Sequence, residues 1–380
     1  MASDGERLTA QQIDRIYEQQ IGAAMLEAVS PSPQPVAVLV GGQPGAGQAV
    51  LIQSLRSELR LADAAPVVVA PDELRAFHPR WRDAAARHSP DAVAATRPET
   101  ELWGERLARD AVAKRANLVL DTSMRRPQDL LVLARHLKSQ GYRVEALIVA
   151  ADRDASRLGS VVRYERLLTR GAIARFVPRQ EHEQAYDAVR ESVSRLEHGK
   201  AVDRLRLITR DGRELFENTV VKNAWRQPEG AAKALEDYRE RVLPAREKAD
   251  NALRWHTLVA RLQARSAEVP REVIAQVVDW RTQSTAQALA DPEARSLYEA
   301  GLAAEAFRSL PGQQFVKEFA HYRAAVNKLE KARDYAAGEL SQPEDRARFV
   351  ALARERIAEQ IEQGRQYGRA RGAEEQDKTR

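Results

Sequence analysis

The chain of 380 residues contains no cysteine and no apolar run of the ~18–20 residues that a membrane-spanning helix needs. Without cysteine, disulfides, thiolate zinc sites, iron–sulfur clusters and a cysteine nucleophile are excluded. Residues 1–14 carry acids where a secretory signal would have basic and apolar blocks. We therefore expect a cytoplasmic protein with no membrane partner, or a secreted effector that acts in the cytosol of a target cell.

An excess of charge of one sign is also missing. The chain has 60 lysines and arginines against 55 aspartates and glutamates, which gives a formal net charge of +5. Basic residues are spread among acids and do not form a stripe, so nucleic acid is not an expected partner. Lysine is rare, and the first one in the sequence is Lys114.

The front of the chain alternates apolar runs with helical patterns. Runs at 36–40, 67–70, 118–121 and 144–150 are typical of strands in a parallel sheet buried on both faces. A helix is expected over 9–28, and the Asp-Gly turn within 205–215 predicts a hairpin that ends the sheet. We predict an α/β domain over residues 1–228, in which helices flank a parallel sheet.

The strand pattern stops after about residue 228. Apolar residues then recur on helix faces, and prolines at 244, 270, 292, 311 and 343 stand where helices begin. These patterns predict four or five helices in an all-α C-terminal domain over 229–364. Residues 365–380 have almost nothing to bury, which predicts a disordered tail.

A glycine-rich segment follows the first predicted strand and precedes a helix. Gly42 and Gly47 fit the fixed glycines of a P-loop, whose backbone N–H groups curl around a phosphate beside the positive end of the helix. A strand-to-helix turn without a ligand is the alternative. The predicted nucleotide-binding residues are Gly42, Gln43, Pro44, Gly45, Ala46, Gly47, Gln48 and Ala49.

Two side chains that a P-loop uses are absent. Gln48 and Ala49 stand where a Walker A motif has the lysine that holds the β- and γ-phosphates and the serine or threonine that holds magnesium. A neutral amide donates a hydrogen bond, but it does not supply the charge that stabilises phosphoryl transfer. The sequence therefore predicts weakened phosphate binding and impaired chemistry.

Three further motifs follow in order: PDELRAFHP at 71–79, LVLDTSMRR at 118–126, and the segment from Val161 to His182. With the glycine loop, they resemble the zeta toxin family, whose core is similar to P-loop kinases, over about residues 10–220. The resemblance implies a kinase that uses ATP or GTP and Mg²⁺ to phosphorylate the sugar 3′-hydroxyl of UDP-N-acetylglucosamine. Related effectors act on NAD, and a small helical antitoxin or immunity protein obstructs the nucleotide site.

The resemblance also assigns roles to individual residues. It makes Asp72 the catalytic base, and Arg163 and Arg175 the arginines that neutralise the transferring phosphate. We expect these three side chains to converge on the glycine loop. The substrate side is assigned to Asp121, where the family more often has glutamate, and to Ser123, Arg125 and Arg75.

Structural interpretations of the same residues stay open. Asp72 could cap a helix that begins at Glu73, Asp121 could cap a strand end, and the two arginines could lie on solvated helix surfaces. We interpret His182 as a structural residue.

Three hypotheses follow for the whole chain. The first is that the chain is a kinase disabled by a substitution at residue 48, although Ala49 is a second departure from the Walker A pattern that one substitution does not explain. Alternatively, it is a natural pseudokinase that serves as a nucleotide-binding or protein-interaction module. A third hypothesis concerns the rear helices, which inhibit the kinase site, dock or target the protein, or only stabilise the sheet domain.

Overall fold

The computed structural model describes residues 7–62, 65–81 and 92–363 of the chain. They divide into two compact units. The first comprises the residues up to Arg241 together with Arg261–Val277, and the second comprises Val242–Ala260 and the residues from Val278 onward. The tail predicted for residues 365–380 lies outside the described residues. Within the described ranges, no helix combines the length and the apolarity that a membrane crossing requires.

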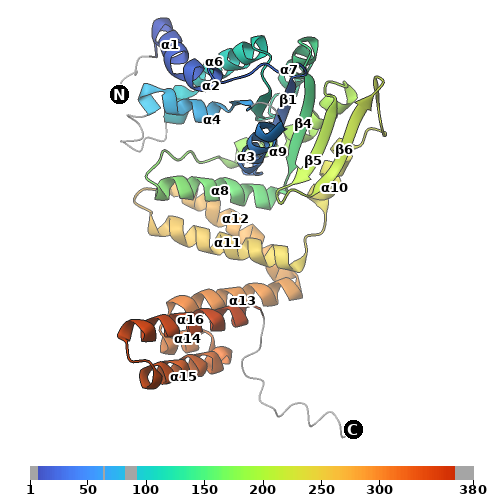
Figure 1. Ribbon diagram of the computed structural model, residues 1–380. Helices are drawn as coiled ribbons and strands as arrows, with labels where there is room; N and C mark the ends of the chain where they lie inside the picture. The colour runs from blue at the N-terminus through green and yellow to red at the C-terminus, as the bar shows by residue number, and fades with distance from the viewer. Residues whose placement is uncertain (1–6, 63–64, 82–91, 364–380) are drawn as a thin grey trace. The chain divides into compact units, whose positions relative to one another are not determined.

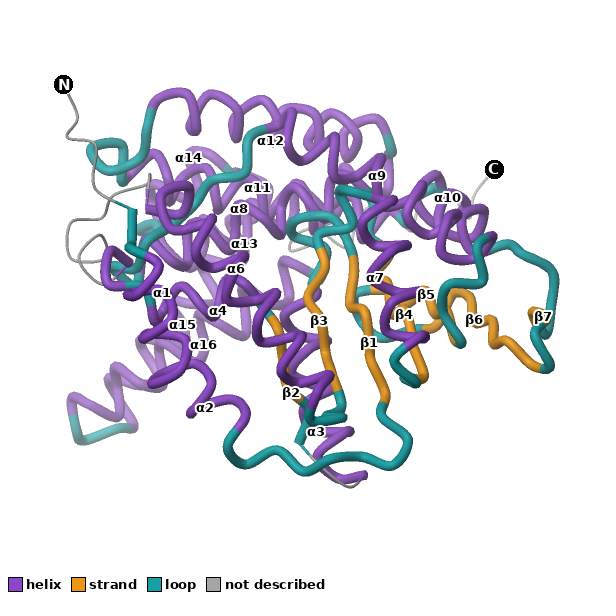
Figure 2. Tube along the Cα trace, turned by 90° about the horizontal axis from the view of Figure 1, so that it is seen from above, coloured by secondary structure: helices purple, strands orange, loops and turns teal. Residues whose placement is uncertain are grey.

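The described part of the first unit contains a seven-stranded sheet in the order β2-β3-β1-β4-β5-β6-β7 (Figures 1 and 2). The strands are β1 (Val36–Gly41), β2 (Val67–Val69), β3 (Leu118–Thr122), β4 (Arg143–Ala150), β5 (Arg204–Thr209), β6 (Glu214–Val221) and β7 (Ala224–Trp225). Neighbours among β1 to β5 pair in parallel, and β6 and β7 continue the sheet antiparallel. The predicted parallel α/β fold with its closing hairpin is confirmed.

The sheet is buried on both faces. Successive side chains of a strand point to opposite sides, so the residues of β1 divide between two cores. Leu39 of β1 belongs to the core that the strands share with α6, α7 and α9. Its neighbours Val38 and Val40 belong to a second core, which they share with Ile52 and Leu55 of α3. Helices on both faces therefore explain why β1 reads as a continuous apolar run.

The helices of the first unit connect and cover these strands. They are α1 (Ala10–Ile16), the π-helical turn η1 (Tyr17–Gly22), α2 (Ala23–Leu26), α3 (Gln48–Ala62), α4 (Pro71–Leu74), η2 (Arg75–Phe77), α6 (Ala92–Ala113), α7 (Pro127–Ser139), α8 (Arg153–Thr169), α9 (Arg179–His198) and α10 (Ala231–Glu240). The first three form the helix expected over 9–28. Thr9 starts it with a capping box to Gln12, and the Trp103 indole of α6 donates to the Ile13 carbonyl.

Helix α10 follows the predicted domain boundary at residue 228, yet it packs on the sheet. Ala231 and Leu235 are completely buried in the same core as β1. The Glu197 carboxylate of α9 accepts hydrogen bonds from the backbone N–H groups of Gly230 and Ala231 at the start of α10. The first unit therefore includes α10, and the boundary at 228 stays a prediction.

The rest of the described chain is helical. The helices are α11 (Ala245–Ala264), α12 (Arg271–Ala290), α13 (Pro292–Ser309), α14 (Gly312–Glu318), η3 (Ala320–Tyr322), α15 (Arg323–Glu339) and α16 (Pro343–Glu362). Each of the five prolines named above stands at the first position of a helix or just before it. In the described chain from Ala231 to Glu362 the count of α-helices is seven, more than the four or five predicted, because α10 and α15 begin without a proline.

Removing the Leu235 side chain tests whether α10 belongs to the sheet core. Because Leu235 is completely buried, Leu235→Ala should lower the free energy of unfolding by about 2–5 kcal/mol. Val132→Ala on α7 is the matched control, since Val132 is 56% exposed and its loss should change stability by less than about 0.5 kcal/mol. Urea denaturation measures both. Equal effects of the two substitutions would show that α10 does not contribute to this core.

Candidate functional site

The glycine loop joins β1 to the start of α3 at Gln48. Gly45 and Gly47 have φ of +81° and +120°, a backbone conformation that side-chain-bearing residues rarely adopt. Ala46 between them is buried against Val149 and Ala151 at the end of β4. The sequence therefore forms the strand, turn and helix that the P-loop frame predicts.

Gly45 lies directly against the backbone of α8. A Cβ atom on Gly45 would come within 2.0 Å of the Ser156 carbonyl oxygen and within 2.5 Å of the Ser160 nitrogen. In the opposite direction, a Cβ on Gly159 would lie 2.3 Å from the Gly45 oxygen. The two glycines thus permit a backbone-to-backbone contact that fixes the loop on α8, the helix that carries Arg163.

Two hydrogen bonds, one at each end of its side-chain amide, hold Gln43 in place. Its side chain is completely buried, and its amide nitrogen donates to the Ala151 carbonyl at 2.9 Å. Its amide oxygen accepts a hydrogen bond from Arg239 of α10 at 3.0 Å. Arg239 also lies 3.7 Å from the centroid of the Tyr186 ring and donates to the Tyr186 carbonyl. Gln43 therefore anchors the loop and does not face a ligand.

Gln48 folds back onto the loop. Its amide nitrogen donates to the Gly42 carbonyl oxygen at 2.7 Å, so the side chain lies across the loop backbone. Ala49 has no hydroxyl group to offer to a metal ion. Both departures from the Walker A pattern thus leave positions 48 and 49 without a charged or hydroxyl-bearing side chain.

Asp72 lies in the short helix α4, which follows β2. One carboxylate oxygen accepts a hydrogen bond from Arg163 of α8 at 2.6 Å, and the other pairs with Arg75. The helix begins after Ala70 and has no side-chain cap, so the alternative role of Asp72 as a capping residue is wrong. The structure therefore brings Asp72 and Arg163, 91 positions apart, into contact.

Arg75 is almost completely buried beneath this pair. Burial, together with the nearby charges of Arg175 and Arg163, lowers its pKa to about 10. Its guanidinium lies 5.9 Å from the centroid of the Trp81 ring. Two arginines, Arg75 and Arg163, therefore contact Asp72, and Arg75 is too buried to lie on an open substrate surface.

Asp121 is the penultimate residue of β3 and pairs with Val40 of β1 in the parallel register. Burial raises the pKa of Asp121 to about 6, and the charge of Glu73 acts in the same direction while Arg163 opposes it. Asp121 lies at the carboxyl edge of the sheet, and α/β proteins bind their ligands at this edge. Asp121 thus shares the electrostatic environment of Asp72 and Arg163.

The remaining predicted substrate residues lie around Glu181, in the first turn of α9. Glu181 accepts a hydrogen bond from Arg125 at 2.7 Å and pairs through its other oxygen with Arg175. Burial alone would raise the pKa of Glu181, but the two arginines hold it below its usual value. Arg175 thus contacts Glu181, not Asp72, and Ser123 is exposed.

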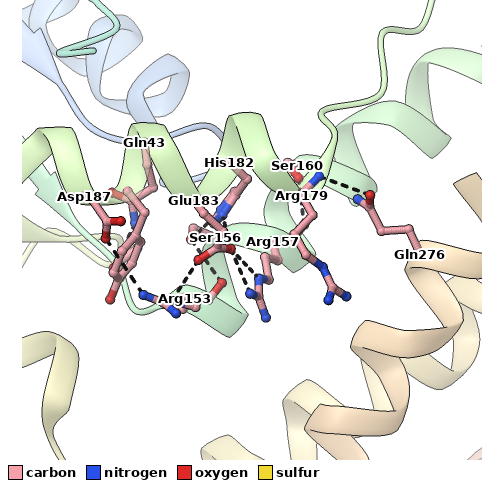
Figure 3. A network of polar contacts seen from close by, with 12 residues as sticks. Gln43, Arg153, Ser156, Arg157, Ser160, Arg179, His182, Glu183, Asp187 and Gln276 are labelled. Carbon is pink, nitrogen blue, oxygen red and sulfur yellow. Dashed lines mark hydrogen bonds and ion pairs between the residues drawn. The ribbon is translucent and has the colours of Figure 1, made fainter. Parts of the chain in front are cut away.

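A buried polar network joins α8 to α9 under the loop. Figure 3 shows the His182 ring between Ser156 and Glu183, with hydrogen bonds of 3.0 and 3.2 Å. Arg157 closes the network on Glu183. Burial lowers the pKa of His182. Ser156 and His182 are both completely buried, so the network positions α8 and offers no nucleophile to a substrate. The structural interpretation of His182 is confirmed.

Sequence reasoning missed two charged residues of this region. Glu181 stands inside the recognised motif, and the two arginines near it could have indicated that a carboxylate pairs with them. Arg210 follows β5 and lies against Gly47 of the loop and Gly159 of α8. The signal for Arg210 is its position directly after a parallel strand, at the sheet edge where β1 also ends.

A magnesium ion would find few protein ligands here. In the ranges that the structure describes, no group of three histidine, aspartate or glutamate side chains is arranged to hold a metal ion. Mg²⁺ on a nucleotide needs only one or two carboxylates, because phosphates and water complete its shell. Asp121 fits such a role, since a bound cation would favour the ionised form that burial disfavours.

A methyl group on Gly45 tests the contact between the loop and α8. Gly45→Ala should lower the free energy of unfolding by about 3 kcal/mol, from the positive φ and from the overlap with Ser156. Gly212→Ala is the matched control, because Gly212 has a φ of +88° with open space around it. It should cost only about 1 kcal/mol. If thermal denaturation gave equal losses, the backbone contact would not constrain the loop.

The raised pKa of Asp121 predicts a pH-dependent stability difference. The folded protein holds this proton more tightly than the unfolded chain, so stability is lost as pH rises from about 4 to about 6. Asp121→Asn should therefore be more stable than the wild type by about 1–3 kcal/mol at pH 7.5, and equally stable below pH 4. Urea denaturation across this pH range measures the difference. A constant difference at all pH values would contradict the burial of an ionisable carboxylate.

Comparison with known proteins agrees with this geometry. A family model described as "Zeta toxin" matches residues 22–221. Toxin PezT of Streptococcus pneumoniae is 26% identical over 181 residues, which cover 47% of this chain and 70% of that toxin. Toxin zeta of Enterococcus hirae is also 26% identical, and the match spans 48% of this chain and 63% of that toxin. A solved structure from the PezAT toxin–antitoxin system of S. pneumoniae superposes with a TM-score of 0.56 at 20% identity, covering 68% of this chain and 98% of that one. The chain therefore belongs to the zeta toxin family.

Proposed function

We propose that this protein is a zeta toxin-like kinase that transfers the γ-phosphoryl group of ATP or GTP to a sugar hydroxyl of a nucleotide-sugar such as UDP-N-acetylglucosamine. The observation that carries the proposal is the 2.6 Å contact between Asp72 and Arg163. It joins a carboxylate at the end of β2 to the helix on which the glycine loop rests. A base and a phosphate-binding cation thus lie side by side.

In this reaction the acceptor hydroxyl oxygen attacks the γ-phosphorus. Its proton passes to the Asp72 carboxylate, and the bond between the γ-phosphorus and the bridging oxygen breaks to release the nucleoside diphosphate. The protein contributes position and charge more than covalent chemistry. Asp72 suits the role of base because its side chain is about half exposed and reachable by a substrate.

The arginines that would bind the phosphates are held by carboxylates. Arg163 pairs with Asp72, and Arg175 pairs with Glu181. A phosphate offers more negative charge and more acceptor oxygens than a carboxylate, so a bound nucleotide competes for both guanidinium groups. When Arg163 turns to the phosphate, Asp72 loses one of its two cationic partners and becomes a stronger base. Nucleotide binding would in this way activate the base.

Mg²⁺, when bound with the nucleotide, would supply positive charge to the phosphate oxygens, and we propose that Asp121 would hold it. The changes at Gln48 and Ala49 remove a cation and a hydroxyl from this arrangement. We therefore propose low turnover for the chain as it stands, since a cation at this position contributes several kcal/mol to phosphoryl transfer.

Two alternatives have specific support. The hydrogen bond from Gln48 to Gly42 keeps position 48 inside the loop, which favours a pseudokinase that binds a nucleotide without transferring phosphate. A dinucleotide such as NAD is the other acceptor to test, because Asp72 would accept a proton from any ribose or sugar hydroxyl that reached it. We also propose a helical antitoxin as partner, since the structural neighbour comes from a toxin–antitoxin system, and cytosol as the place of action.

Restoring the lysine tests the kinase hypothesis. Gln48→Lys should raise the transfer of radiolabelled γ-phosphate from ATP to UDP-N-acetylglucosamine by about 100-fold, because it returns the missing charge. Adding Asp72→Asn should remove at least about 100-fold of that gain while leaving ATP affinity nearly unchanged. Glu73→Gln is the matched control, because Glu73 is the adjacent carboxylate and pairs with Arg56, not with Arg75 or Arg163.

The outcomes separate the hypotheses. Phosphorylation of NAD in place of the nucleotide-sugar would reassign the acceptor. Nucleotide binding without transfer to any acceptor, even with Gln48→Lys, would support the pseudokinase. Equal losses from Asp72→Asn and Glu73→Gln would exclude Asp72 as the base.

A further inference from the structure

Arg210 stands at the first position of the turn between β5 and β6. The turn is tight: the Thr209 hydroxyl bonds to the Asp211 side chain, and the Thr209 backbone N–H donates to the Arg213 carbonyl. β5 runs parallel to β4, and β4 runs parallel to β1, so β1 and β5 end at the same edge of the sheet. Two strand spacings of about 4.8 Å separate them, a gap that a long arginine side chain spans.

The Arg210 side chain does cross to the glycine loop. A Cβ atom on Gly47 would lie 3.4 Å from Cγ and 3.6 Å from Nε of Arg210. A Cβ on Gly159 would lie 2.8 Å from Nη2 and 3.2 Å from Nη1. The guanidinium group therefore rests where the loop meets α8, in space that two glycines leave open. Gly159 stands inside a helix, where glycine costs about 1 kcal/mol relative to alanine.

This position adds a second arginine to the same face of α8. Arg163 follows Gly159 by four residues, and residues four apart lie on one face of a helix. Arg210 thus reaches the loop from the β5–β6 turn, and Arg163 lies one helical turn along α8 from Gly159. Gly47 immediately precedes the residue that replaces the Walker A lysine. The region lacks a cation at position 48 but has one supplied by the β5–β6 turn.

We propose that Arg210 binds the phosphate groups of the nucleoside triphosphate held by loop 42–47 and supplies the positive charge that Gln48 does not. The inference rests on the proposed nucleotide site and adds a phosphate-binding residue to it. A purely structural role, in which Arg210 braces the loop against α8, is the competing interpretation. The two differ in one respect: a phosphate-binding charge matters more as the ligand carries more phosphates, whereas a brace does not.

The test measures the affinity of the full chain for ATP, ADP and AMP with Mg²⁺ by calorimetry. Arg210→Gln should weaken ATP binding by about tenfold or more and AMP binding by less than about threefold. Arg210→Lys should stay within about threefold of the wild type for ATP. Arg213→Gln is the matched control, since Arg213 is an exposed arginine of the same turn. Combining Arg210→Gln with Gln48→Lys should restore ATP affinity, because a lysine at 48 returns the charge.

Each contrary outcome has a distinct meaning. ATP affinity of Arg210→Gln equal to that of Arg213→Gln would overturn the role of Arg210 and leave the proposed function intact. Equal weakening of ATP and AMP, failure of Gln48→Lys to rescue, or an Arg210→Gln chain that does not fold would identify a brace and also overturn it. No ATP binding by the wild type or by Gln48→Lys would overturn the nucleotide site itself, and the role of Arg210 with it.

Discussion

The contact between the backbone of Gly45 and the backbone of α8 decides how this molecule is arranged. Because no side chain separates the loop from the helix, the loop cannot shift without moving α8, and Arg163 moves with it. The buried network of Ser156, His182 and Glu183 then fixes α8 to α9, where Glu181 holds Arg175. Residues far apart in the sequence become neighbours through this chain of rigid contacts. The positions of the charged groups are thus a consequence of packing.

The electrostatics of the site follow from burial. Two arginines, Arg75 and Arg163, share the single carboxylate of Asp72, and Arg75 is buried deeply enough for its pKa to fall to about 10. Such an excess of positive charge in a partly buried site is unfavourable by itself, and an anion would relieve it. Asp121 shows the opposite imbalance, with its pKa raised by burial. A polyanion together with a cation would satisfy both groups, which is the combination that a nucleotide and its metal ion provide.

The fold could be predicted from the sequence where local patterns decide it. Apolar runs that are buried on both faces identified the strands, and prolines marked five helix starts, because both depend on residues close together in the chain. The composition change groups the residues of α10 with the rear helices, whereas α10 packs on the sheet, because Leu235 contacts distant strands and Glu197 accepts hydrogen bonds from its first residues. Asp72 and Arg163 could be identified through the family motifs. The pairing of Gln43 with Arg239 and the reach of Arg210 could not, because each requires the order of strands in space.

Long-range contacts also attach part of the C-terminal helices to the sheet-containing unit. Residues 261–277, from the end of α11 to the first half of α12, belong to the compact unit that holds the sheet. Arg265 donates to the Leu168 carbonyl at the end of α8, and the side chain of Gln276 accepts from the backbone of Arg179 at the start of α9. A chain cut near residue 228 would lose these supports together with Arg239, the partner of Gln43 in the loop. Loss of nucleotide binding after such a cut would therefore report damage to the site, and only substitutions confined to the second unit can separate an inhibitory role of the helices from a supporting one.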